Sequence, residues 1–157
     1  MSDDPLDAVD KGVIYALQQN AKDATTLAVG EQLDVSASTI RNRIERLEAE
    51  GVITGYHAMV DYEKAGFPLH VLLVCTAELD DRNQLALAAL KIPGVVNVRE
   101  FMVGEGNVRV EAIGTSNDDI TRIARELASL GLRISEEILL RAQYVSPFEA
   151  FNPEFEE

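Results

Sequence analysis

The chain has 157 residues, which is room for one ordinary domain or two small ones, and its 46% of hydrophobic residues is enough for packed cores. No apolar run reaches the roughly 18 to 20 residues that span a bilayer, and the acidic start lacks the layout of a signal peptide. A cytoplasmic protein with no membrane partner is therefore expected. One cysteine and two histidines exclude a credible zinc site, and no cofactor or metal is expected.

The formal net charge of −13 comes from 27 acids against 14 bases, only four of which are lysines. A surface dense in acids with few lysines is typical of proteins from haloarchaea, which work in molar salt. At that salt the Debye length is about 3 Å, so repulsion between the protein and DNA is largely screened. The alternative is an acidic protein from ordinary salt with no nucleic-acid partner, and composition alone leaves both open.

The first 60 residues show a helical period. A helix is predicted over about Leu6–Asn20, where apolar residues recur every three or four positions. A second is predicted to begin at Thr25 or Thr26 and to end near Leu33. Two helices joined by a turn of three or four residues, of which the second is well capped, are typical of a helix-turn-helix.

The third predicted helix follows almost at once, with Ser36 as its N-cap and Gly51 as its left-handed stop. Residues 52–60 then favour two short strands around a turn, which would form a wing. The sequence therefore predicts a winged helix-turn-helix DNA-binding domain over residues 1–60.

Residues 61–68 are polar, contain a glycine and a proline, and are predicted to be a linker. The segment 69–148 alternates between strand and helix patterns in the order βαββαβ, which is typical of the ferredoxin-like fold. Its last strand is predicted through Ile138, Leu140, Ala142 and Tyr144. Residues 149–157 are interpreted as an acidic tail. The predicted fold class is α+β.

The first two turns of the third helix contain no acid before Glu45, which is informative in so acidic a chain. Only this part of a recognition helix reaches base edges. Asparagine pairs with adenine, arginine with guanine, and serine or threonine with a base or a phosphate. The predicted DNA-binding residues are Ser36, Ser38, Thr39, Arg41, Asn42, Arg43 and Arg46. The alternative is an ordinary solvated helix with ion pairs such as Arg41–Glu45.

These residues resemble the Lrp/AsnC, or feast/famine, family of transcriptional regulators over about residues 5–148. The opening Leu6-Asp7-Ala8-Val9-Asp10 resembles the start of the family's first helix. The stretch from Ser36 to Glu48, followed by Gly51-Val52-Ile53, resembles its recognition helix and wing.

The resemblance implies a regulator that binds double-stranded DNA, forms a homodimer through its C-terminal sheets, and assembles into tetramers or octamers. It also implies an amino acid or related effector bound between dimers at the loop Gly104, Glu105, Gly106 and Asn107.

Three residues depart from the family pattern. Gly30 stands within a helix where the family favours alanine, at a cost of roughly 1 kcal/mol of helix propensity. Asp34 replaces a glycine in the turn, which Asp tolerates because it can adopt left-handed geometry. Asn107 replaces a loop aspartate that could hold the ammonium group of an effector, although Glu105 could supply that charge.

Two other functions remain open. Sirohaem decarboxylases share the two-domain plan, but their wing usually reads Arg-Arg-Ile-Gly-Ala, where this chain has Thr54-Gly55-Tyr56-His57-Ala58. His57 is interpreted as a wing or linker contact and His70 as a strand-edge residue rather than as catalytic groups, so no enzyme is expected. Alternatively, the C-terminal domain is only an assembly module of an architectural DNA-binding protein and binds no ligand.

Overall fold

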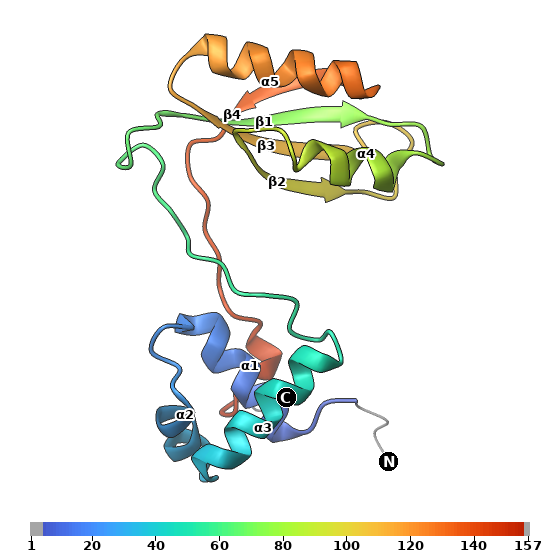
Figure 1. Cartoon of the computed structure of the whole chain (residues 1–157). Coiled ribbons are helices and arrows are strands. Elements are labelled where there is room, and N and C mark those ends of the chain that lie inside the picture. The colour runs from blue at the N-terminus through green and yellow to red at the C-terminus, as the bar shows by residue number, and fades with distance from the viewer. Residues whose placement is uncertain (1–4, 156–157) are drawn as a thin grey trace. The chain divides into compact units, whose positions relative to one another are not determined.

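The computed structural model describes residues 5–155, and these form two compact units (Figure 1). Unit 1 contains residues Met1–Ala58 together with Tyr144–Glu157, and unit 2 contains Met59–Gln143. The sequence-based boundaries placed residues 144–148 in the second domain and interpreted 149–157 as an acidic tail. In the structure residues 144–155 belong to the first unit instead.

Unit 1 contains three helices, α1 (Ala8–Asn20), α2 (Thr26–Leu33) and α3 (Ala37–Ala49). Each begins at a side chain that accepts a hydrogen bond from a backbone N–H of the first turn, which satisfies a donor that the helix itself leaves free. Ser36 caps α3 as predicted, and Thr25, one of the two predicted candidates, caps α2. Asp7 caps α1 in a reciprocal capping box.

The turn between α2 and α3 is held by left-handed backbone at Asp34, whose φ is 56°, as predicted for this residue. The Val35 amide donates to the Gly30 carbonyl over 2.9 Å, which closes the turn against α2. Gly51 has a φ of 72° and ends α3 as predicted.

A short 3-10 helix, η1 (Glu149–Phe151), packs against α1. The Phe151 ring joins the core of unit 1, whose fully buried members include Val13, Ile40 and Leu47. Pro153 lies beside Gly12: the proline ring is 3.3 Å from the position that a Cβ on this glycine would occupy. The C-terminal segment is acidic in composition, but its apolar residues complete the helix-turn-helix core.

The predicted wing strands are wrong. Residues 52–60, which all lie in the described part of the chain, form turns and extended coil with no strand ladder. Val52 and Ile53 donate instead to the Leu47 carbonyl, over 2.9 and 3.1 Å. Their backbone groups therefore extend the end of α3 and do not build a hairpin.

Unit 2 has the element order β1 (Leu69–Thr76), α4 (Arg82–Ala89), β2 (Val95–Glu100), β3 (Val108–Gly114), α5 (Asn117–Leu130) and β4 (Arg133–Leu139). The strands form one antiparallel sheet in the order β2-β3-β1-β4, as the predicted βαββαβ arrangement requires. The linker residues 61–68 precede β1 as turns and coil.

One face of this sheet carries both helices. Val71, Leu73 and Cys75 of β1 pack with Val110 of β3 and Ile123 of α5 in the core. Because side chains alternate between faces, the residues between them point away from the helices. His70, Leu72 and Val74 of β1 lie on this open face, beside Glu111 of β3.

Two strand ends are set by the neighbouring strand. β2 stops at Glu100, and the Phe101 amide then donates to the Asn107 carbonyl over 2.8 Å, where the chain turns toward β3. The last strand was predicted to run to Tyr144, but it stops at Leu139. Its last bond to β1 joins the Leu140 amide to the His70 carbonyl at 2.7 Å, and β1 has begun only one residue before His70.

Candidate nucleic-acid interface

Three hydroxyl groups meet at the N-terminus of α3. The Ser36 Oγ accepts from the Thr39 amide at 3.1 Å and lies 2.9 Å from the Ser38 Oγ and 2.8 Å from the Thr39 Oγ1. A helix N-terminus carries partial positive charge and N–H donors, which suit a phosphate oxygen. The predicted residues Ser36, Ser38 and Thr39 are thus gathered at one point.

Arg41 and Asn42 follow on the exposed surface of α3. Within the described residues, no ion pair joins Arg41 to an acid, so the predicted Arg41–Glu45 pairing of an ordinary solvated helix does not form. These two side chains are available to a partner.

Arg43 and Arg46 are engaged differently from the prediction, because both guanidinium groups are paired with acids of α1. Arg43 lies 2.5 Å from an Asp7 oxygen and 3.1 Å from Asp10, and Arg46 lies 2.5 Å from Asp10. The hydrogen bond that Arg43 donates to Asp7 raises the pKa of Arg43, and the hydrogen bond that Arg46 donates to Asp10 raises the pKa of Arg46. The pKa of Asp7 is lowered, mainly because its carboxylate accepts a hydrogen bond from the backbone N–H of Asp10 and also because Arg43 donates to it.

The partner of both arginines, Asp10, was not identified as functional from the sequence. Its side chain is only 1% exposed. The available signal was the Asp7-x-x-Asp10 spacing, which places both acids at the start of α1, Asp7 as its N-cap and Asp10 in its first turn.

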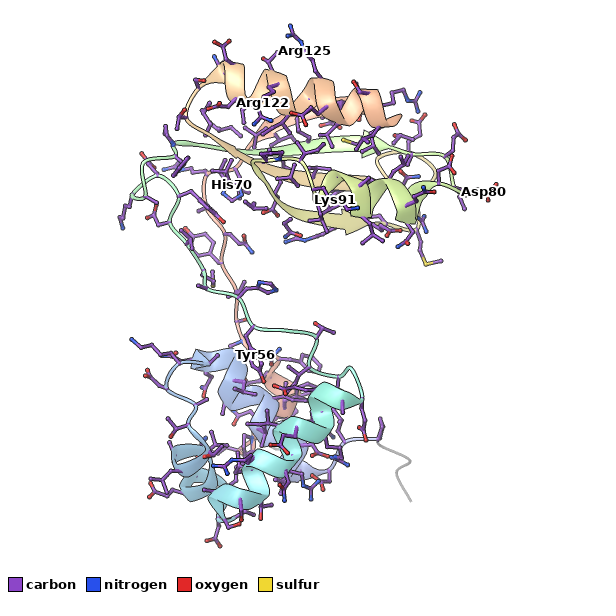
Figure 2. All side chains as sticks on the ribbon, viewed as in Figure 1. Tyr56, His70, Asp80, Lys91, Arg122 and Arg125 are labelled. Atoms are coloured by element: carbon purple, nitrogen blue, oxygen red, sulfur yellow. The ribbon has the colours of Figure 1, made fainter. Side chains whose placement is uncertain are left out.

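Tyr56 ties the segment after α3 back to that helix (Figure 2). Its hydroxyl donates to the Glu48 carboxylate over 2.8 Å. Burial and this bond raise the pKa of Tyr56 to about 12. The residues predicted to form the wing are therefore held by a side chain in place of a strand pair.

The predicted effector loop of unit 2 divides into an exposed part and a fixed part. Gly104 and Glu105 are exposed, and Glu105 lies 3.5 Å from Arg133. Gly106 has a φ of 63°, and its amide donates to the Thr76 hydroxyl over 2.9 Å. Asn107 is fully buried.

Both polar atoms of the Asn107 amide group have a partner. Its Oδ1 accepts from the Ala77 amide and its Nδ2 donates to the Ala77 carbonyl, each over 2.9 Å. Asn107 therefore fastens the loop to the end of β1 and does not offer its side chain to an effector, contrary to the prediction.

Apolar side chains stand exposed near this loop. Leu79, just after the residue that Asn107 holds, is 71% exposed, and Met102 and Val103, just before Gly104, are 96% and 52% exposed. Exposed apolar groups gathered at one end of a domain are typical of an interaction surface.

The two histidines lie in different settings. His57 is exposed in unit 1, whereas His70 lies on the open sheet face of unit 2 (Figure 2), 3.3 Å from Glu111 and edge-on to the Tyr62 ring. Across residues 5–155 no group of three or more His, Cys, Asp or Glu residues could hold a metal ion. No helix in that same range is long and apolar enough to cross a membrane.

Comparison with known proteins agrees with this geometry. Residues 6–54 match the family model for winged helix-turn-helix DNA-binding domains. An uncharacterized HTH-type transcriptional regulator of Pyrococcus furiosus is 28% identical over 143 residues, covering 86% of this chain and 91% of its own length. The regulator Ptr1 of Methanocaldococcus jannaschii is 35% identical over 68 residues, covering 43% of this chain and 45% of its own.

Solved structures share the whole fold. The leucine response regulatory protein LrpA of Mycobacterium tuberculosis has a TM-score of 0.73 at 21% identity, covering 90% of this chain and 96% of its own. AsnC of E. coli has a TM-score of 0.65 at 20% identity, covering 91% and 97%. A transcriptional regulator of Neisseria meningitidis, solved with L-Met, has a TM-score of 0.69 at 21% identity, covering 91% and 96%.

The chain is thus a helix-turn-helix transcriptional regulator that binds DNA through its first unit. Its two-unit α+β fold is the fold of the Lrp and AsnC regulators. The relatives named here come from Pyrococcus and Methanocaldococcus and give no support to a haloarchaeal source.

Proposed function

We propose that the chain is a regulator of the Lrp/AsnC type, which reads double-stranded DNA with the N-terminal half of α3. The observation that carries this is the acid-free N-terminus of α3, where three hydroxyls gather ahead of the exposed Arg41 and Asn42. The hydroxyls and the helix N-terminus suit phosphate, and the Asn42 amide suits adenine.

Selection of bound sites from random duplex DNA tests this proposal. In the selected operator, Asn42→Ala is expected to weaken binding by roughly 1–3 kcal/mol and to relax the preference at one base position. Arg41→Ala is expected to weaken operator and scrambled duplexes about equally, as loss of a phosphate contact does. Gln32→Ala, an exposed change on α2, is the control variant and is expected to leave both folding and operator binding unchanged. Operator binding that Asn42→Ala leaves unchanged would overturn the proposal.

The second unit is proposed to pair two chains and to respond to a small effector. Its open sheet face exposes Ile138 beside Leu72, which supports pairing of two sheets into a homodimer. The exposed apolar residues Leu79, Met102 and Val103 support further assembly into tetramers or octamers beside the 104–107 loop.

An amino acid or related metabolite is the proposed effector, and the solved regulator that contains L-Met supports this chemistry. With Asn107 occupied, the ammonium group of such a ligand has Glu105 as its acceptor in the loop. Amino acids, L-methionine first, are screened by thermal melting and light scattering. A ligand moves an assembly equilibrium only through different affinity for its states.

Glu105→Gln is expected to abolish any shift in melting or assembly, whereas Glu137→Gln, an exposed change on β4, is expected to preserve it. If no ligand shifts either property, unit 2 is an assembly module only. Visible absorbance of the purified protein checks the enzyme alternative, because a bound tetrapyrrole is coloured.

Adaptation to high salt remains a proposal that rests on composition. With 27 acids against 14 bases, lowering the salt lengthens self-repulsion. The free energy of unfolding is expected to fall below a few hundred millimolar KCl. Equal stability at low and high KCl would remove this proposal and leave the DNA-binding function untouched.

A further inference from the structure

The ion pairs between α1 and α3 form one connected group. Asp10 contacts both Arg43 and Arg46, and Arg43 also contacts Asp7, whose amide donates to Asp10 over 3.2 Å. Asp10 is 1% exposed, whereas the side chains of Arg43 and Arg46 are 29% and 41% exposed and that of Asp7 is 50% exposed. The buried member of the group is thus the acid, and the cations lie at the surface of α3.

A buried carboxylate is costly unless it is paired and hydrogen-bonded. Removing either arginine from Asp10 would leave part of that charge uncompensated inside the domain. The two guanidinium groups therefore stay with Asp10 as long as it is ionised. Since α3 contains three arginines, only Arg41 remains free for the DNA backbone.

We propose that Asp10 is a positioning residue for DNA recognition, which holds Arg43 and Arg46 against α1 and so keeps two of the three cations of α3 off the phosphates. The inference rests on the proposed function of α3. Phosphate contacts raise affinity for every sequence equally, whereas base contacts discriminate. By withholding two phosphate contacts, Asp10 lowers non-specific binding and leaves discrimination to the base contact of Asn42.

The proposal predicts a change in the salt dependence of DNA binding, because each phosphate contact releases counterions from the DNA. Each additional phosphate contact steepens the dependence of log affinity on log salt by about 0.9. One freed arginine would therefore make the loss of affinity between 50 and 200 mM KCl about 3.5-fold larger, and two freed arginines about 12-fold larger.

The test uses the full chain carrying Asp10→Asn, which keeps the side chain's shape and removes its charge. Binding to the selected operator and to a scrambled duplex is measured across KCl concentrations. We expect the salt slope to steepen by about 0.9 to 1.8, affinity for the scrambled duplex to rise several-fold at low salt, and the ratio between the duplexes to fall.

Two further variants distinguish the positioning of Arg43 and Arg46 by Asp10 from an effect of net charge and from an effect on protein stability. Asp23→Asn makes the same change in net charge at an exposed site between α1 and α2, and it is expected to leave the slope unchanged. Adding Arg43→Gln and Arg46→Gln to Asp10→Asn is expected to restore the original slope, because the freed cations are gone.

A folded Asp10→Asn variant that weakens both duplexes equally, with an unchanged slope, would show that Asp10 acts through stability alone and overturn the inference. If Asp10→Asn does not fold, Asp7→Asn replaces it. That change loosens only Arg43 and is expected to steepen the slope by up to about 0.9, and an unchanged slope there overturns the inference equally. Failure of the wild-type chain to select any operator would instead reject the proposed function.

Discussion

The carbonyl oxygen of Val35 lies 2.7 Å from the position that a Cβ on Gly30 would occupy. Since this oxygen belongs to the backbone of the turn between α2 and α3, it cannot swing aside as a flexible side chain would. Gly30 is therefore required because the turn approaches the α2 backbone closely. A larger residue would favour the helix but would not leave room for this turn.

Gly30→Ala is accordingly expected to lower the free energy of unfolding by about 1–3 kcal/mol, despite the gain of about 1 kcal/mol in helix propensity. Urea unfolding measures this change. Glu31→Ala, at an exposed neighbouring position, is expected to stay within about 0.5 kcal/mol of the wild type. An alanine at residue 30 that stabilises the protein would contradict the close approach.

Asn107→Asp should destabilise unit 2 by about 1–3 kcal/mol at neutral pH, because an ionised carboxylate cannot donate to the Ala77 carbonyl. Burial would raise the folded-state pKa of the new carboxyl above its unfolded value of about 3.9. The protonated form is then favoured in the folded state. Relative to wild type, stability should decline as pH rises from about 4 and level off above the folded pKa.

Thermal melts of Asn107→Asp and wild type at pH 4 and pH 7 check this sign. Asn117→Asp, an exposed change in the first turn of α5, serves as the matched control and is expected to show no such pH dependence. A deficit that is larger at pH 4 than at pH 7 would argue against the paired bonds of Asn107.

Phe151→Ala should destabilise unit 1 by about 1–2 kcal/mol, since its ring is half-buried against the helix-turn-helix core. Phe155→Ala, which removes a more exposed ring from the same segment, is the matched comparison and should have little effect. Chemical denaturation followed by DNA binding distinguishes the two. Equal stability of both variants would show that the segment does not support the domain.

Tyr56 is expected to titrate near pH 12, later than an ordinary tyrosine. Because its folded pKa is raised, its bond to Glu48 contributes stability that is complete below about pH 10 and is lost as pH rises through about 12. Absorbance at alkaline pH follows the ionisation, and Tyr56→Phe should remove the late component. A Tyr56 that ionises near pH 10 would count against the bond.

Local chemistry accounts for what could be predicted from the sequence. The caps Thr25 and Ser36 and the left-handed residues Asp34 and Gly51 depend on their immediate neighbours, and all four are confirmed. The order of strands and helices in unit 2 could also be predicted, because apolar residues repeat every two positions in a strand and about every 3.6 in a helix, within the segment alone.

Features that depend on a distant partner could not be read in this way. Arg46 points outward on an isolated helix, and only the packing of α1 brings Asp10 to it. The role of Asn107 depends on Ala77, 30 residues earlier, whose backbone N–H and carbonyl bind both polar atoms of the Asn107 amide group. The end of β4 was set by where β1 begins rather than by its own alternation.

Because residues 144–155 return to the first unit, the second unit is an insertion within a DNA-binding domain rather than an appendage to it. A fragment that stops at residue 60 would lack Phe151 and Pro153, so a minimal DNA-binding piece must contain both chain segments. Both boundaries of the insertion, Met59 and Gln143, are joined covalently to that domain. The chain therefore enters and leaves the inserted unit through two covalent connections, one leading from α3 and the other leading to the segment that packs on α1.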